Sequence, residues 1–152
     1  MGTDCLRCVI GGTTVALPIG DVNKISELAI TPPMPLSEPW VGGVSLLNEK
    51  VWITVNFDRR GDDSQKERNR KGVLFKEGQD GVRWSLEIDE VAGLGTVDNI
   101  EEAPLTIRGW TCPEPWIRKA KTPEGKVIGW IDTASIRAHL KNVATSSGVN
   151  HG

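Results

Sequence analysis

Cysteine, histidine and paired acidic residues are the side chains whose types and spacing could support chemistry in this sequence. Cys5-Leu6-Arg7-Cys8 has the C-x-x-C spacing of zinc ligands and redox dithiols. The segment is strand-like, however, and residues three apart in a strand point to opposite faces. Cys112, His139 and His151 could complete a zinc site only if folding happened to gather them. We therefore expect structural thiols, with no metal and no cofactor.

Catalytic arrangements find no support in the sequence. Asp89-Glu90 and Glu101-Glu102 are adjacent carboxylates, and neighbours in a strand diverge instead of converging across a cleft. Gly93-Leu94-Gly95 lacks the third glycine and the following helix of a dinucleotide-binding loop. The motifs of serine hydrolases, P-loop nucleotide hydrolases and zinc proteases do not occur. His139 is expected on the solvated surface of a helix, and the sequence predicts a protein that is not an enzyme.

Composition limits the possible partners and compartment. The chain has 152 residues and a net charge of −2, which fits one domain without a basic excess for nucleic acid. The six tryptophans are scattered and do not alternate with basic residues. No apolar run approaches the ~18–20 residues of a membrane span, so we expect no membrane insertion. The first residues lack the pattern of a signal peptide, which favours a cytoplasmic protein.

A short segment occurs twice and indicates how the chain is organised. Glu38-Pro39-Trp40-Val41 returns 76 residues later as Glu114-Pro115-Trp116-Ile117, and a Lys-Val pair follows each copy at the same distance. A weaker echo relates Leu17–Val22 to Leu86–Val91 through the pattern L-x-I-x-x-V. These repeats predict two related small units, about 13–57 plus the end of the chain and about 72–131. The charged stretch 58–71 between them is interpreted as a solvated loop or linker.

The elements that would position these residues are mostly strands. Short apolar runs bounded by glycine and proline predict about ten strands, which favours an all-β fold of two small barrels. Val44–Leu47 and Val51–Phe57 should form a hairpin about Asn48-Glu49. Asp132 or Thr133 could cap a short C-terminal helix from about Ala134 to Val143.

The repeated tryptophans leave two interpretations open. Trp40 and Trp116 could each fill a barrel where the crossing segment enters it. Alternatively, one of them could anchor a partner, because tryptophan is enriched at interaction hot spots.

The order and spacing of several segments resemble the chemotaxis adaptors of the CheW-like family. The first half carries the resemblance through Val15–Val22, the proline-rich 32–35, Trp40–Leu47 and Val51–Phe57. The second half fits through Leu86–Val91 and the closing Val127–Asp132 before the helix. The similarity covers roughly residues 5–142, so the whole chain, 1–152, would be a single CheW-like domain.

The resemblance implies two SH3-like five-stranded β-barrels that share a core, with a short C-terminal helix. It also implies a non-enzymatic scaffold that links the cytoplasmic tips of chemoreceptors to a CheA-type histidine kinase. The partners would be the receptor tip and the regulatory domain of the kinase or another CheW-like domain. The expected contact residues lie on and before the hairpin: Trp40, Val41, Val44, Leu46, Asn48 and Lys50.

One departure from the family pattern falls inside this region. Family members usually carry Asn-Leu-Arg-Gly at this hairpin, where this chain has Leu46-Leu47-Asn48-Glu49. A short neutral amide cannot imitate the five donors of the arginine that the family uses around receptor binding. Two alternatives therefore remain: a divergent adaptor that keeps only one of its two interfaces, or a generic SH3-like protein-binding module.

Overall fold

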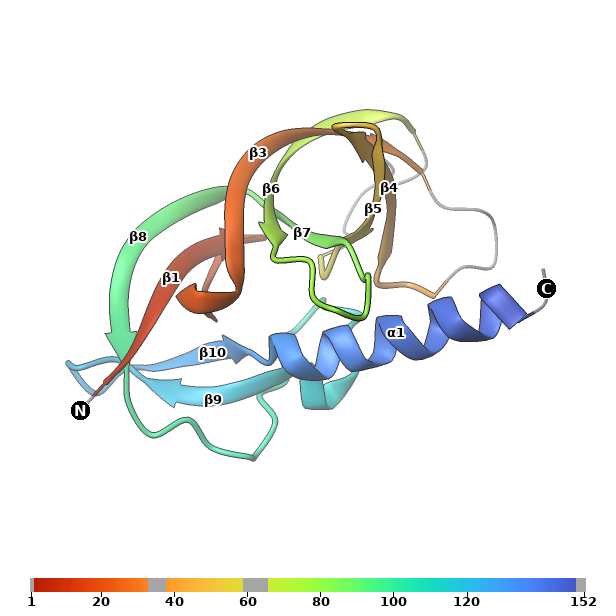
Figure 1. Cartoon of the computed structure of the whole chain (residues 1–152). Coiled ribbons are helices and arrows are strands. Elements are labelled where there is room, and N and C mark those ends of the chain that lie inside the picture. The colour runs from red at the N-terminus through yellow and green to blue at the C-terminus, as the bar shows by residue number, and fades with distance from the viewer. Residues whose placement is uncertain (1, 33–37, 59–65, 150–152) are drawn as a thin grey trace.

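The computed structural model describes residues 2–32, 38–58 and 66–149, and these residues form ten strands and one α-helix (Figure 1). The strands are β1 Thr3–Ile10, β2 Thr13–Pro18, β3 Val22–Thr31, β4 Val41–Leu47, β5 Lys50–Val55, β6 Arg68–Phe75, β7 Trp84–Ile88, β8 Glu90–Val97, β9 Ile117–Lys121 and β10 Val127–Ile131. The helix α1 spans Thr133–Val149, and two short 3-10 helices lie at Ile19–Asp21 (η1) and Glu114–Trp116 (η3). The predicted mainly-β fold is therefore confirmed.

The middle of the chain closes into a barrel. Its strands follow the order β3-β4-β5-β7-β6, and β6 pairs with β3 to complete the circle. β5 and β7 run parallel, while the other pairs are antiparallel. In Figure 1 the long, bent β3 and β6 form the arch at the top of the molecule. Bending two long strands allows five strands to close without leaving an unpaired edge.

The two ends of the chain build the second sheet, in the order β8-β1-β2-β10-β9. The segment after β8 extends it along β9, because Asp98 and Lys121 exchange two backbone hydrogen bonds of 2.7 and 2.9 Å. Farther along, Glu101 N–H donates to the Lys119 carbonyl and Leu105 N–H to the Ile117 carbonyl, both at 2.8 Å. This irregular segment thus connects the two edge strands of the second sheet, β8 and β9, where the sequence predicts a second five-stranded barrel.

One core joins the two sheets, as predicted. Alternate residues of each strand point toward it: Leu6, Cys8 and Ile10 from the second sheet face Val73, Phe75, Trp84, Leu86 and Ile88 from the barrel. Ile136 and Leu140 of α1 belong to the same cluster. The intervening residues line each barrel separately, with Trp130 and its neighbours in one and Trp52, Leu28 and Leu74 in the other.

The two repeated tryptophans are buried together at this junction. Trp40 and Trp116 are each 3% exposed, and their ring centroids lie 5.0 Å apart in an edge-on arrangement. His139 of α1 meets both rings edge-on, at 5.4 and 5.6 Å. Trp40 therefore lies in the core, where its predicted role in binding stays a prediction, and His139 is half-buried against the two rings, where the sequence predicts a solvated residue. Both follow from the docking of α1 against the two crossing segments.

The predicted charged loop 58–71 ends earlier than expected. Residues 59–65 lie outside the described residues, but β6 already begins at Arg68. Its charged side chains are compatible with a strand because Arg68 pairs with Glu87 of the neighbouring strand β7, and Arg70 pairs with Asp89 just after that strand. The proline-rich crossing at 32–35 also falls largely outside the described residues.

The predicted subdomains, about 13–57 plus the end of the chain and about 72–131, stay a prediction, and the two sheets are divided at other points of the chain. The strands β3 to β7 form the barrel, and the strands before and after them in the sequence form the second sheet. The division moves because β3 pairs with β6 from the second repeat, while β1 pairs with β8. The origin of the repeat by duplication stays a prediction.

The start of α1 is capped as the sequence predicts, but the helix is longer. Asp132 accepts hydrogen bonds from Ser135 N–H at 3.1 Å and from Ser135 Oγ at 2.8 Å. These bonds satisfy a backbone donor that a helix leaves free at its N-terminus. The helix then continues to Val149, six residues beyond the predicted end at Val143.

Candidate protein-interaction surface

An apolar patch lies on the outer face of the β4–β5 hairpin. Val44 is 40% exposed, Leu46 70% and Val51 53%, and Leu46 stands directly opposite Val51 in the ladder. These three residues are called the hairpin patch below. Ser45 between them points inward, where its hydroxyl lies 3.4 Å from that of Thr54. Because side chains alternate along a strand, Val44 and Leu46 of β4 point to solvent. Val55 of the neighbouring strand β5 is, by contrast, fully buried.

The turn beyond the hairpin patch has an unusual backbone. Asn48 and Glu49 have φ angles of 52° and 66°, and the two residues connect Leu47 to Lys50. Positive φ at both central residues is the geometry of a two-residue type I′ hairpin turn. Asparagine tolerates this region, whereas glutamate is strained in it. The predicted hairpin and its turn are confirmed, with Glu49 where glycine would fit best.

A charged rim borders the hairpin patch. Glu77 lies between two basic groups, 3.5 Å from Lys50 Nζ and 3.1 Å from Arg83 Nη1. Arg83 Nε also donates to the carbonyl of Val51 at 3.2 Å. An apolar centre with a polar rim is the usual anatomy of a protein–protein contact. The surface therefore has the composition of a docking site for another protein.

The six predicted contact residues do not all share this surface. Val44, Leu46, Asn48 and Lys50 are exposed on the hairpin, Val41 is half-buried, and Trp40 is buried. Their role in binding stays a prediction. Val51 lies on the same face of β5 as Val55, which is fully buried, but Val51 itself is 53% exposed. Its repeat counterpart Val127 is exposed in the same way, at 48%.

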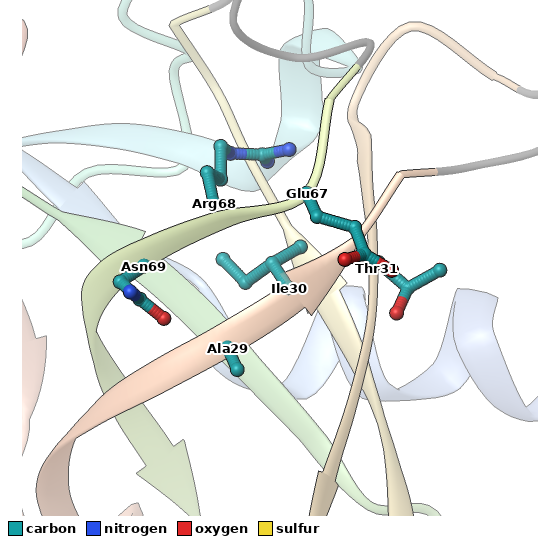
Figure 2. A pocket seen from close by; sticks show the side chains of 6 residues that line it. All are labelled: Ala29, Ile30, Thr31, Glu67, Arg68 and Asn69. Carbon is teal, nitrogen blue, oxygen red and sulfur yellow. The ribbon is translucent and has the colours of Figure 1, made fainter.

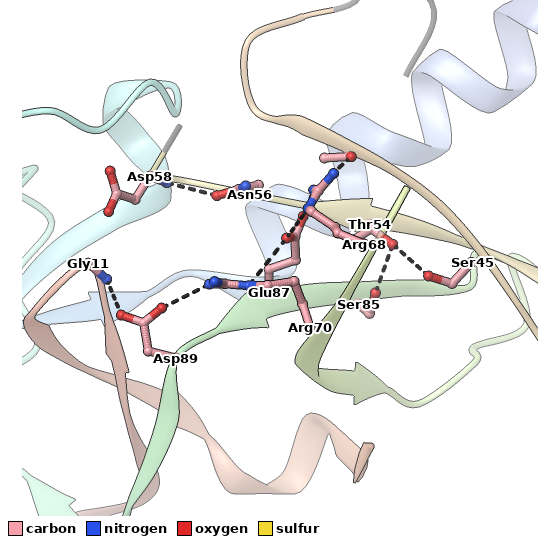
Figure 3. A network of polar contacts seen from close by, with 11 residues as sticks. Gly11, Ser45, Thr54, Asn56, Asp58, Arg68, Arg70, Ser85, Glu87 and Asp89 are labelled. Carbon is pink, nitrogen blue, oxygen red and sulfur yellow. Dashed lines mark hydrogen bonds and ion pairs between the residues drawn. The ribbon is translucent and has the colours of Figure 1, made fainter. Parts of the chain in front are cut away.

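A polar network fills one end of the barrel (Figure 3). Glu87 is 1% exposed and pairs with Arg68 through contacts of 2.7 Å to Nη2 and 3.3 Å to Nε. Arg68 Nη2 also donates to the Gly42 carbonyl at 3.0 Å. Next to this pair, Arg70 binds Asp89 at 2.8 Å, and Asp89 accepts the N–H of Gly11 at 2.8 Å. The network therefore links the start of β4 and the β1–β2 turn to strands β6 and β7.

The cysteines are placed as structural thiols. Cys5 and Cys8 are buried on opposite faces of β1, Cys5 in the interior of the second sheet and Cys8 in the shared core. Burial raises the pKa of the Cys8 thiol to about 12, with a smaller contribution from Cys5. Burial likewise raises the pKa of Cys112 to about 11. Such thiols stay protonated and are poor nucleophiles and ligands. Among the described residues, no three acidic, histidine or cysteine side chains gather as metal ligands would.

A shallow pocket lies where β3 ends and β6 begins (Figure 2). Thr31 and Glu67 lie at one end of it, and the other residues lining it are Ala29, Ile30, Arg68 and Asn69. Among these lining residues Glu67 supplies a carboxylate and Arg68 a guanidinium.

Comparisons with known proteins agree with the predicted fold. No family model and no curated protein matches the sequence. Among solved structures, the chain is similar to the scaffolding protein TtCheW from Thermoanaerobacter tengcongensis, with 16% sequence identity and a TM-score of 0.59. The match covers 87% of this chain and 90% of that chain. The CheW-like resemblance in the sequence is thus confirmed at the level of the fold. Among the described residues, no helix is long and apolar enough to cross a membrane.

Proposed function

We propose that this protein is a non-enzymatic cytoplasmic adaptor that links the cytoplasmic tips of chemoreceptors to a CheA-type histidine kinase. The observation that carries the proposal is the exposed hairpin patch on a scaffold with the CheW fold. The patch lies beside the Asn48-Glu49 turn. At this turn, members of the CheW-like family carry an arginine that they use around receptor binding. Binding two partners at once would raise their effective concentration for each other, and no chemical step would be needed.

The hairpin patch is the proposed receptor contact. Burial of Leu46 and Val51 against an apolar partner would remove from water two side chains that are more than half exposed. Asn48 and Lys50 would lie at the edge of this contact and face polar groups. The kinase regulatory domain, or another CheW-like domain, would bind a different face of the molecule.

Separate binding experiments test the two contacts. The receptor tip and the kinase regulatory domain are each titrated with the full chain and with Leu46→Lys, which places a charge in the hairpin patch. We expect receptor binding to weaken at least about tenfold, which corresponds to 1.4 kcal/mol, with kinase binding unchanged. Lys50→Ala at the rim serves as the control and should change affinity much less. Absence of binding to both partners would contradict the proposal.

A second candidate function is an adaptor with only one working interface, favoured by Asn48 in place of the family arginine. Asn48 is exposed at the turn, so an arginine there would reach solvent and a partner without disturbing the core. If the missing guanidinium weakens receptor binding, Asn48→Arg should strengthen it, since arginine forms several charge-assisted hydrogen bonds. An unchanged affinity would remove this explanation. Binding to one partner alone would select the single-interface adaptor.

A further inference from the structure

The second sheet ends at β8, and no strand of the described chain lies along its outer edge. The sheet order begins with β8, which pairs with β1 alone. The opposite edge strand, β9, is covered, because Asp98, Glu101 and Leu105 bind its backbone. In Figure 1, β8 curves along the left side of the molecule. The backbone groups that point outward from β8 are therefore available to another chain.

The pairing of β1 with β2 decides which residues of β8 point outward. Ile10 and Thr13 flank the two-residue turn Gly11-Gly12, whose φ angles of 57° and 80° are those of a type I′ turn. Such a turn closes on a hydrogen-bonded pair, and hydrogen-bonded pairs alternate along an antiparallel ladder, so the backbone of Leu6 binds β2. Leu6 lies opposite Leu94, whose N–H and carbonyl therefore point away from β1.

Two further contacts agree with this direction. Asp98 exchanges backbone hydrogen bonds with Lys121 of β9, on the side of the strand away from β1. Arg7 Nη2 donates to the Thr96 carbonyl at 3.2 Å, so that carbonyl is not used by the backbone of β1. Alternate residues of a strand point to the same edge, so Leu94, Thr96 and Asp98 share the outer one. Among the described residues, this leaves the N–H and carbonyl of Leu94 without a partner.

The side chain of Leu94 is exposed as well. It is 76% exposed, the highest value among the large apolar side chains that the structure describes. Its neighbours Gly93 and Gly95 have no side chains that could shield it. Because Leu94 lies opposite Leu6, which belongs to the shared core, the two side chains are on the same face of the sheet. A strand added at this edge would therefore bury Leu94 and extend that face.

The charges of β8 select the kind of chain that fits this edge. Glu90 begins the strand, Asp98 follows it, and no basic residue lies between them. A second copy paired about Leu94 would place Glu90 opposite Asp98, and like charges directly opposite each other are destabilising. A helix does not fit either, because its backbone groups are already bonded within the helix. The open N–H and carbonyl require an extended segment, and the two carboxylates favour basic residues at its ends.

We propose that the open edge of β8 binds an extended segment of a partner protein as an added antiparallel strand, with an apolar side chain against Leu94 and basic residues toward Glu90 and Asp98. Antiparallel pairing is the slightly more stable of the two directions. Backbone hydrogen bonds would supply affinity, and the residue opposite Leu94 would supply selectivity. The edge belongs to the second sheet and the hairpin patch to the barrel. The edge would therefore bind such a segment whether or not the chain links a receptor to a kinase.

Hydrogen exchange at single amides tests the proposal with a designed probe, the peptide Lys-Val-Thr-Val-Thr-Val-Lys with blocked termini. Its valines share one face of a strand, and its lysines lie at the ends. In the full chain alone, the Leu94 amide should exchange much faster than the Gly95 amide, which points toward β1. Peptide binding should slow exchange at Leu94 at least about tenfold and leave Gly95 unchanged. No slowing at Leu94 would overturn the proposal.

Methylation of the peptide backbone separates strand addition from binding by side chains alone. With the central valine opposite Leu94 in an antiparallel pair, the valine N–H groups point toward β8 and the threonine N–H groups point away. Methylation of the central valine nitrogen should abolish binding, whereas methylation of a threonine nitrogen should change it little. Equal effects of the two modifications would contradict strand addition. Equally tight binding of a peptide with glutamate in place of both lysines would contradict the role of the two carboxylates.

Two lysine substitutions complete the test on the protein. Leu94→Lys places a charge at the open edge and should weaken peptide binding at least about tenfold. Leu46→Lys places the same charge on the barrel and is the matched control, which should bind the peptide as the parent does. Both leucines are more than two-thirds exposed, so both variants should fold. Equal binding by the two variants would overturn the proposal.

Self-association is the remaining outcome. Exchange at Leu94 that slows with rising protein concentration, without peptide, would assign the edge to a second copy and overturn the proposal. No receptor or kinase takes part in these measurements, so a failure of the proposed function leaves their result unaffected.

Discussion

Glu49 shows at the scale of one residue how the hairpin departs from an ideal turn. Its φ of 66° lies in the left-handed region, where a Cβ atom crowds the backbone. Glycine has no such penalty, so Glu49→Gly should raise the free energy of unfolding by about 1 kcal/mol. Urea denaturation would measure the change.

The control for this prediction is an exposed glutamate with negative φ. Glu102→Gly removes the same side chain in a loop without relieving strain. It should leave stability unchanged or lower it, because glycine adds freedom to the unfolded chain. Equal effects of the two substitutions would show that the backbone of Glu49 is not strained.

Asp132 makes stability depend on pH. Partial burial acts to raise its pKa, but hydrogen bonds from Ser135 and the Arg118 guanidinium at 2.7 Å outweigh burial and hold the pKa below its ordinary value. A carboxyl with a lowered pKa in the folded state stabilises the protein above its unfolded pKa, and this contribution is lost as the pH falls through the folded pKa. Asp132→Asn keeps a cap acceptor but loses the charge. The parent should therefore be more stable than Asp132→Asn at pH 7, with the difference shrinking below about pH 4. A difference that is constant from pH 7 to pH 2 would contradict this account.

Residue-level features were predictable where local chemistry decides them. The helix cap at Asp132 and the opposite faces of Cys5 and Cys8 follow from capping preference and strand alternation. The position of His139 did not follow, because it depends on two tryptophans that are distant in sequence. The burial of Trp40 could not be predicted from the sequence either, because the sequence is compatible with both a core and a surface position for this tryptophan.

At the scale of elements, α1 is held by a few large side chains. Ile136 and Leu140 are buried in the shared core, while Lys141 beside them is exposed. Leu140→Ala should lower the free energy of unfolding by about 2–5 kcal/mol, because it leaves a cavity under the helix. Lys141→Ala should change it by less than about 0.5 kcal/mol. Thermal unfolding of both variants makes the comparison, and similar melting temperatures would contradict the docking of α1.

The elements themselves were easier to predict than their pairing. Alternation and turn residues indicate the ten strands and the Asn48-Glu49 hairpin. The pairing of β3 with β6, and the parallel contact of β10 with β2, join segments far apart in the chain. Such pairings depend on the packing of the whole core, and a local sequence pattern does not predict that packing. The division between the two sheets therefore follows from these long-range pairings, which the repeat does not indicate.

At the scale of the whole molecule, the shared core should make the two sheets unfold together. Trp52 lies inside the barrel and Trp130 inside the second sheet, so variants that retain one of them report on each part. Because a single cluster spans both sheets and α1, both probes should give the same urea midpoint. Separate midpoints would show that the sheets are independent units.

Simultaneous binding of two proteins is the central claim about the whole molecule. The most direct measurement is sedimentation of the receptor tip and the kinase regulatory domain, mixed with and without this chain. The account predicts a ternary complex that forms only when the chain is present and that is lost with Leu46→Lys. Two binary complexes that exclude each other, or a ternary complex unaffected by Leu46→Lys, would contradict it.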